Sequence, residues 1–351
     1  MKFDVAAAGE KLLILGWGLL AFVVVVGGLL FLLDTVPNWF ARRAERRLTA
    51  AAQAQDSTAR ARRRSRRSEA VFAFFLLLPA VLLLFIGLVV PTIRTVVLSL
   101  MDGSGQRWVG LDNYAWMFSQ DESLIVLRNT LIWVILVPLL ATSVGLIYAV
   151  LVDRSRFESF AKALIFMPTA ISFVGAGIIW KFVYAYRSAE QDQIGLLNQL
   201  VVWAGGEPQQ WLQNPPLNTF FLIIVMVWIQ AGFAMVVLSA AIKAIPAEII
   251  EAARLDGVNA WQMFWRITLP SIRPALVVVV VTISIATLKL FDIVRTMTNG
   301  NFETNVIATE MYNQAFRYGQ VGRGSALAVV LFILVIPLVI YQIRNLRRQG
   351  A

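Results

Sequence analysis

The segment Glu251-Ala252-Ala253-Arg254-Leu255-Asp256-Gly257, followed after nine intervening residues by Ile267-Thr268-Leu269-Pro270, is a polar stretch between two long apolar ones. Pro246 suits the first turn of a helix, and Glu251 lies towards the positive N-terminal end of that helix. Gly257 can take the left-handed backbone conformation that ends a helix. These residues predict a short helix over 246–256 that stops at Gly257.

A second helix is predicted directly after the first. Asn259 can cap its beginning, and Pro270 and Pro274 redirect the chain at its end. One face of this helix carries Trp261, Phe264, Trp265 and Thr268. The two helices predict a helix-turn-helix elbow outside the bilayer, and the alternative is an amphipathic connector that lies on the membrane surface.

The composition is that of a membrane protein. Of 351 residues, 58% are hydrophobic and 15% charged, far from the balance of soluble proteins. A helix of about 20 residues crosses the ~30 Å hydrocarbon core, because each residue adds about 1.5 Å. The sequence predicts an all-α transmembrane protein, a polytopic helical bundle with about seven spans. They lie at 12–33, 71–93, 131–152, 163–184, 220–242, 275–294 and 327–343.

The distribution of Lys and Arg predicts the orientation. If the elbow is cytoplasmic, most of the 31 basic residues lie inside, as the positive-inside rule requires. The N-terminus is then outside and the C-terminus cytoplasmic. The apolar core of the first span is too long for a signal peptide, so 1–33 is interpreted as an uncleaved transmembrane anchor. The Arg-rich stretch 34–70 is interpreted as a cytoplasmic linker held near anionic lipid, with a regulatory or partner-binding role as the alternative.

Several kinds of chemistry are excluded by absent residues. The chain has no Cys and no His, so thiolate or imidazole metal sites and Ser-His-Asp triads are excluded. It has no G-x-x-x-x-G-K-[ST] loop, so it cannot hold ATP phosphates in the P-loop manner. No metal or cofactor is expected on this chain. Aromatic residues are not interleaved with the linker arginines, so binding to nucleic acid is not expected either.

The elbow resembles the EAA coupling loop of ABC importer permeases, in which E-A-A, Gly and I-x-L-P stand at these spacings. From about Phe72 to Leu346 the chain is similar to permeases of the carbohydrate-uptake branch of type I ABC importers, the maltose and α-glucoside group. Further resembling segments are Phe166-Met167-Pro168, Lys243-Ala244-Ile245-Pro246, Phe291-Asp292-Ile293-Val294 and Met297-Thr298-Asn299-Gly300. The α-glucoside subgroup is indicated by 289–294 and 306–308. The resemblance implies a six-span core over 71–346, with the coupling loop at 243–270, preceded by one additional N-terminal span.

The resemblance also implies an assembly in a bacterial-type plasma (inner) membrane. A second related permease, two cytoplasmic ATPase subunits and an extracytoplasmic sugar-binding protein are the expected partners, besides membrane lipids and the sugar substrate. ATP and Mg would be bound by the ATPase subunits, so this chain is expected to be a transport subunit and not an enzyme. Residues expected to contact the ATPase are Glu251, Ala252, Ala253, Leu255, Asp256 and Gly257.

Counting from the elbow along the resemblance gives a candidate substrate path near mid-membrane: Met226, Ile229, Gln230, Phe233, Thr282, Ala286 and Lys289. The amide of Gln230 suits sugar hydroxyls, and the ring of Phe233 suits the apolar face of a sugar. Met226 and Ala286 replace polar residues of maltose permeases, which argues against maltose itself.

Each of these candidates also has a structural interpretation. Phe233 and Met226 fit ordinary helix packing. Trp228 is expected to pack or to face lipid. Lys289 can extend to the outer interface, aided by Asp292 one turn later, instead of serving a function.

Other classes of protein are less compatible with the sequence. A permease for phosphate, amino acids or another non-sugar solute would share the elbow. An ion-driven secondary carrier would need titratable groups within its spans, and no predicted span interior holds Asp or Glu. A structural membrane protein would fit the composition but would not need the elbow motif.

Overall fold

The computed structural model describes residues 77–153 and 156–349, together with the single residues Trp17, Leu20, Gly28 and Phe74. The predicted linker 34–70 lies outside these residues, as does the predicted anchor 1–33 apart from its three single residues. The chain divides into two compact units, Met1–Ile93 and Arg94–Ala351. In the described part of the chain, extended pairing is limited to one isolated bridge between Met101 and Trp108. The predicted all-α fold is confirmed.

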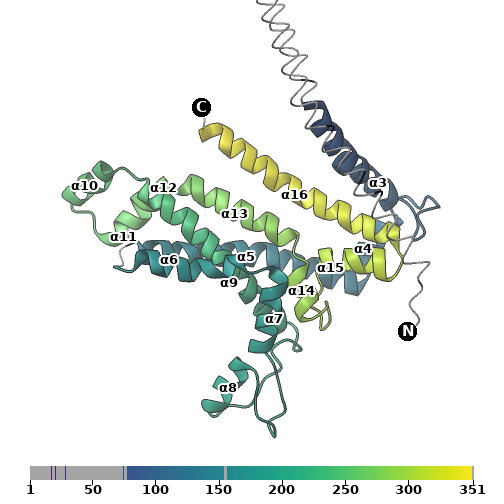
Figure 1. Ribbon diagram of the computed structural model, residues 1–351, viewed down its shortest axis with the longest axis horizontal. Helices are drawn as coiled ribbons and strands as arrows, with labels where there is room; N and C mark the ends of the chain where they lie inside the picture. Colours follow the sequence, from purple (N-terminus) through teal and green to yellow (C-terminus); the bar gives the residue numbers. More distant parts are fainter. Residues whose placement is uncertain are drawn as a thin grey trace, which may run out of the picture. The chain divides into compact units, whose positions relative to one another are not determined.

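The second unit is built around long helices (Figure 1). Helix α5 (Asp121–Val152) packs against α9 (Leu217–Lys243), and α13 (Arg273–Leu288) packs against both α5 and α16 (Val321–Gln349). In chain order the elements are η1 (Phe85–Val89), α3 (Val90–Ser99), α4 (Asp112–Ser119), α5 (Asp121–Val152), α6 (Glu158–Phe166), η2 (Met167–Ala170), α7 (Phe173–Val183), α8 (Leu196–Trp203), α9 (Leu217–Lys243), α10 (Ala247–Leu255), α11 (Ala260–Met263), η3 (Phe264–Thr268), α12 (Leu269–Ser271), α13 (Arg273–Leu288), α14 (Asp292–Met297), α15 (Ile307–Tyr312), η4 (Asn313–Arg317) and α16 (Val321–Gln349).

In the described residues, four helices are long and apolar enough to cross a membrane, and the number rises to six if each of two bent helix pairs counts as one span. The four single helices are Leu77–Ser99, Asp121–Val152, Leu217–Lys243 and Val321–Asn345. A polytopic membrane protein is therefore confirmed for the described residues.

The predicted uninterrupted span over 163–184 is wrong. Glu158–Ala170 and Phe173–Val183 meet at a bend of 102°. Pro168 lies in the 3-10 turn η2 and has no N–H to continue the helical ladder. Ser172 then begins α7 by accepting a hydrogen bond from the backbone N–H of Gly175 over 3.0 Å.

The predicted span over 275–294 is also interrupted. Helix α13 ends at Leu288, Lys289 takes the C-cap position, and the chain turns before α14 begins at Asp292. The backbone N–H of Leu290 closes this turn on the carbonyl of Thr287 over 3.1 Å. Lys289 therefore lies at a helix end and not within a continuous helix.

Small residues allow the helices to approach closely in the core. A Cβ at Gly145 of α5 would come within 2.8 Å of the backbone N of Met235 and 2.9 Å of the carbonyl O of Ala231, both on α9. Such a contact is available only to a residue without a side chain. Around this contact the core buries Trp133, Leu222, Met226, Leu238, Val279, Ile283 and Ile293.

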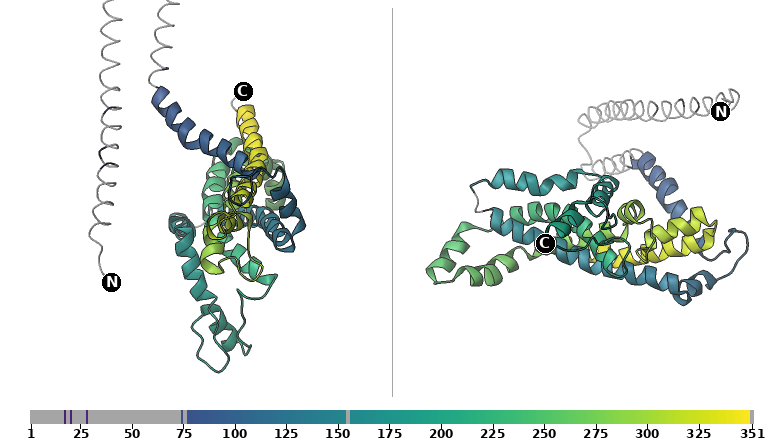
Figure 2. Two further views of the ribbon diagram at one scale, coloured as in Figure 1. Left: turned by 90° about the vertical axis from the view of Figure 1, so that its right-hand side faces the viewer. Right: turned by 90° about the horizontal axis from the view of Figure 1, so that it is seen from below.

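The two ends of the bundle carry different elements. Helices α10 and α11 lie at one end, and α4 and α15 lie at the other (Figure 1). The segment that contains α7 and α8 extends away from the bundle (Figure 2, left). Within it, buried Asn198 donates to the carbonyls of Ala185 and Gln209 over 2.9 and 3.0 Å and accepts from Trp211. These bonds organise an otherwise irregular segment.

Candidate functional site

The first helix of the elbow ends as the sequence predicts. Helix α10 spans Ala247–Leu255, and Gly257 follows with φ +74°. The backbone N–H of Gly257 donates to the carbonyl of Arg254 over 3.1 Å, and that of Val258 donates to the carbonyl of Ala253 over 3.0 Å. This pair of bonds is a Schellman motif, in which the residue at Gly257 must be left-handed. The predicted stop is confirmed.

The second helix of the elbow is also capped as predicted. The Asn259 side chain accepts from the backbone N–H of Gln262 over 2.9 Å, and the Gln262 side chain accepts from the backbone N–H of Asn259 over 3.1 Å. This reciprocal arrangement is a capping box, so Gln262 has a role that the sequence analysis missed. Trp261 and Trp265 pack edge to face with ring centroids 5.5 Å apart, and both are exposed.

The residues expected to contact a partner are mostly on the surface. Ala253 is buried, whereas the side chain of Leu255 is 89% exposed. Glu251, Ala252, Asp256 and Gly257 are exposed as well. An apolar side chain between exposed acidic groups is available to a partner protein, because no part of the chain that the structure describes covers it.

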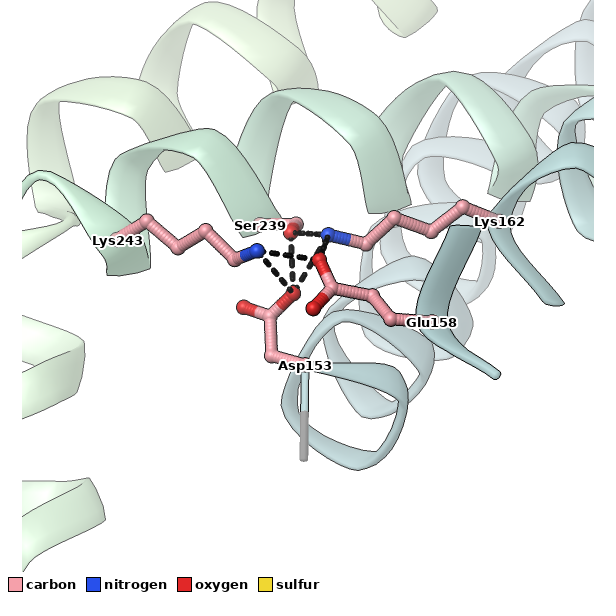
Figure 3. Close-up of polar contacts among 5 residues, drawn as sticks. All are labelled: Asp153, Glu158, Lys162, Ser239 and Lys243. Carbon is pink, nitrogen blue, oxygen red and sulfur yellow. Dashed lines mark hydrogen bonds and ion pairs between the residues drawn. The ribbon is translucent and has the colours of Figure 1, made fainter. Parts of the chain in front are cut away.

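A group of charged and polar side chains joins three helices of the bundle near the end of α9, from which the chain enters the elbow (Figure 3). We call Asp153, Glu158, Lys162, Ser239 and Lys243 the ion-pair cluster. Lys162 Nζ lies 2.6 Å from Asp153 Oδ1 and 2.8 Å from Glu158 Oε1. Ser239 Oγ donates to Asp153 Oδ1 over 2.6 Å, and Lys243 pairs with Glu158. The cluster thus joins the end of α5, the start of α6 and the end of α9.

The charges of the ion-pair cluster are balanced and partly withdrawn from solvent. Two carboxylates face two ammonium groups, and the Lys162 side chain is 21% exposed whereas that of Lys243 is 52% exposed. An exposed pair adds little stability, but removal of one partner from a largely buried pair leaves a charge without compensation. The Asp153–Lys162 pair is therefore the main electrostatic contact of the cluster.

Sequence analysis missed this cluster. It used the charges at 153–162 and Lys243 only to predict orientation. A local signal was present, since Glu158 and Lys162 are four residues apart and share a helix face. Their pairing with Ser239 and Lys243, about 80 residues later, is set by the packing of α6 on α9 and has no local sequence signal.

The predicted path residues of α9 have different environments. Met226 and Ile229 are buried in the hydrophobic core, as the packing interpretation of Met226 requires. Phe233 is half-buried. Gln230 is 9% exposed, and its side chain makes no hydrogen bond to any described residue. An amide without a protein partner is free to form hydrogen bonds with water or a ligand through its donors and acceptor.

Trp228, the neighbour of these residues, packs edge to face on Trp180 with ring centroids 5.6 Å apart. It also borders a cavity of about 370 Å³ between α5, α6 and α9. The packing interpretation of Trp228 is thus confirmed.

The predicted path residues of α13 lie nearer to its surface. Thr282 and Lys289 are exposed, and Ala286 is half-buried. Among the described residues, Lys289 forms no ion pair with Asp292. Helix α13 packs against α9, so the path residues come from two adjacent helices. Their contact with a substrate stays a prediction.

Comparisons with known proteins identify relatives over most of the chain. The osmoprotective compounds uptake permease protein GgtC of Synechocystis sp. is 52% identical over 271 residues, which cover 77% of this chain and 97% of GgtC. The alpha-glucoside transport system permease protein AglF of Rhizobium meliloti is 50% identical over 284 residues, which cover 81% of this chain and 84% of AglF.

Solved structures share the fold. A bacterial ABC transporter involved in the import of the acidic polysaccharide alginate contains a chain that matches with a TM-score of 0.68 and 24% identity, covering 82% of this chain and 99% of that one. The family model described as "Binding-protein-dependent transport system inner membrane component" matches residues 48–348, which include the elbow and all four long helices. The chain belongs to this family of inner membrane transport components.

Proposed function

We propose that this chain is a membrane-spanning permease subunit of an ATP-driven sugar importer and forms half of the translocation path for an oligosaccharide or α-glucoside. The observation that carries the proposal is the 50% identity to AglF, which extends over 81% of this chain. The exposed elbow at 251–257 supports it, because a permease without a nucleotide-binding loop must receive the energy of ATP through contact with another subunit.

In the proposed assembly the chain pairs with a second permease, and a binding protein delivers the sugar from outside. Two ATPase subunits bind ATP and Mg and contact the elbows. The elbow end of the bundle is cytoplasmic, which leaves the N-terminus outside and the C-terminus inside. Residues 1–33 serve as an anchor, 34–70 as a cytoplasmic linker and 71–346 as the transport domain. Closure of the ATPases moves the elbows together and switches the permease pair from inward-open to outward-open.

The sugar path is proposed to run along α9 and α13. Gln230 supplies an amide without a partner in the described protein, and Phe233 supplies a half-buried ring for the apolar face of a sugar. Thr282 and Lys289 are exposed and can donate hydrogen bonds to hydroxyls. Met226 and Ile229 support this face from the core, and Ala286 leaves room beside it.

Uptake of labelled substrate by the complete assembly tests the proposal. The assembly is reconstituted in proteoliposomes with its binding protein, and labelled trehalose is offered with internal ATP. We expect uptake that requires ATP and the binding protein. Absence of uptake for a panel of α-glucosides, with transport of a solute of another class, would contradict the sugar assignment.

A second candidate substrate is an osmoprotective solute, since the relative GgtC is an osmoprotective compounds uptake permease protein. Glycine betaine is offered to the same proteoliposomes as the comparison. Uptake of glycine betaine in preference to every α-glucoside would support this candidate.

A further inference from the structure

A polar pocket lies at the end of the bundle opposite the elbow. It is a cavity of about 400 Å³ between the start of α5, the loop 299–305 and η4. Hydrogen-bonding side chains dominate its lining, among them Glu122, Asn299, Asn301, Glu310, Gln314 and Arg317. Its volume falls within the usual range of small-molecule sites. The pocket is separate from the proposed sugar path. Gln230 of that path lies about 20 Å along α9 from the first turn of the helix.

Gln314 has a free acceptor at this pocket. The residue is 7% exposed, and its Nε2 donates to Glu310 Oε1 over 2.6 Å. Its buried Oε1 receives no hydrogen bond from any described residue. An acceptor withdrawn from water without a donor is unfavourable, so the pocket is complete only when a donor enters it.

The pocket is held in shape before any ligand arrives. Both oxygens of Glu310 accept from amides, Oε2 from Asn305 and Oε1 from Gln314, each over 2.6 Å. The loop wall is fixed by buried Asn129, which donates to the carbonyl of Asn305 over 3.0 Å, and by buried Asn218, which donates to that of Phe302 over 2.7 Å. Preorganisation of this kind lowers the entropic cost of binding.

The chemistry of the lining selects a class of ligand. Free amides of Asn299 and Asn301 offer donors and acceptors together, which suits hydroxyl groups that both donate and accept. Three carboxylates, those of Glu122, Glu303 and Glu310, line the pocket with Arg317, and Arg128 pairs with Glu303 over 3.5 Å, so the lining has no excess of positive charge to attract an anion. The described residues contain no group of three or more His, Cys, Asp or Glu side chains that could hold a metal ion. The lining therefore suits a neutral, hydroxyl-rich molecule better than an anion or a metal ion.

We infer that the polar pocket binds a neutral sugar or polyol at the extracytoplasmic end of the permease, as a site separate from the path along α9 and α13. The placement outside and the choice of a sugar rest on the proposed function. The free acceptor of Gln314 receives a hydroxyl hydrogen bond, and Glu310 positions the amide that offers it.

Saturation-transfer NMR on the full chain in lipid nanodiscs tests the inference with trehalose as the probe and glucuronate as the anionic comparison. We expect a saturable trehalose signal in the unmodified chain and no signal with glucuronate. Gln314→Leu removes the free acceptor and should weaken the signal at least fivefold. The matched control is Gln191→Leu, whose exposed side chain is not part of the pocket lining and which should bind normally.

A further variant keeps the inference testable if Gln314→Leu fails to fold. Asn301→Ala alters an exposed side chain of the pocket and should also weaken trehalose binding. Normal trehalose binding by Gln314→Leu and Asn301→Ala, or equal binding of glucuronate, would overturn the inference.

The uptake assay separates this inference from the proposed function. Trehalose binding that depends on Gln314, in an assembly that transports no sugar, would leave the pocket standing and reject the importer assignment. Sugar uptake by the assembly without Gln314-dependent binding would support the importer assignment and reject the pocket as a sugar site.

Discussion

Ser239 Oγ lies 2.6 Å from Asp153 Oδ1, so the end of α9 is bonded directly to the end of α5. Lys162 from α6 contacts both residues, which brings three helices together at one point. The elbow begins four residues after Lys243, the last residue of α9. The contact therefore fixes the end of α9, from which the chain enters the elbow.

Lys162→Met should destabilise the protein through the loss of the Asp153–Lys162 pair. The pair is largely buried, so we expect a loss near the lower end of the range for buried pairs, about 3 kcal/mol. Thermal unfolding of the purified chain in nanodiscs measures it. Lys243→Met, at an exposed position, should cost less. The double variant Asp153→Asn, Lys162→Met should recover part of the stability, and an unchanged melting temperature in Lys162→Met would show that the pair is not stabilising.

Glu251→Lys should abolish association with the ATPase without altering stability. Glu251 is exposed on α10, so reversal of its charge changes the surface offered to a partner and not the packing. Co-purification of the ATPase subunit with the variant is the measurement, and the melting temperature of the chain is the control. Glu190→Lys, an exposed charge reversal in the segment between α7 and α8, should retain the ATPase. Equal recovery of the ATPase with Glu251→Lys and the unmodified chain would remove Glu251 from the proposed contact.

The transport activity of variants at Gly257 should follow how readily the new residue adopts a left-handed backbone conformation. A Cβ at this position would meet no atom within 4 Å, so the cost is conformational and not steric. Gly257→Asn should retain most transport because Asn adopts positive φ readily, whereas Gly257→Val should cost about 1–2 kcal/mol and most of the uptake. Uptake of labelled trehalose by the reconstituted assembly gives the ranking. Full activity of Gly257→Val would mean that the Schellman turn is not required.

Gln230→Leu should separate a role in transport from a role in stability. The Gln230 amide makes no hydrogen bond to the described protein, so an apolar side chain of similar size should leave the melting temperature unchanged or raise it. Loss of its hydrogen bond to the sugar should cost about 1–3 kcal/mol, or roughly 5- to 150-fold in uptake. Trp228→Ala is the control that should act through stability, since Trp228 packs on Trp180. Normal uptake by Gln230→Leu would place the sugar path elsewhere.

The features that sequence analysis predicted correctly depend on neighbouring residues. The left-handed stop at Gly257 and the cap at Asn259 are decided within four or five residues, and both are present. The long helices were predicted correctly for the same reason, because each follows from a continuous apolar stretch of the sequence. The span boundaries were less accurate, because hydropathy does not register that Pro168 breaks a helical ladder or that Lys289 ends α13.

The features that sequence analysis missed depend on contacts between distant segments. Ser239 and Asp153 are 86 residues apart, and their bond follows from the packing of three helices. The polar pocket likewise joins Glu122 to Gln314. Composition identified these residues only as polar groups near predicted span ends, because no local pattern specifies which of them meet.

Helix α9 is fastened at both ends. It has 27 residues without proline, about 40 Å in length. Asn218 in its first turn is bonded to the loop that walls the polar pocket, and Ser239 in its last turns is bonded to α5 beside the elbow. Linkage between two bound partners is reciprocal: each changes the affinity for the other by the same factor. In the proposed assembly, a sugar that favours one position of the loop therefore changes the affinity of the ATPase for the elbow. Binding of the ATPase changes the affinity of the pocket for that sugar by the same factor.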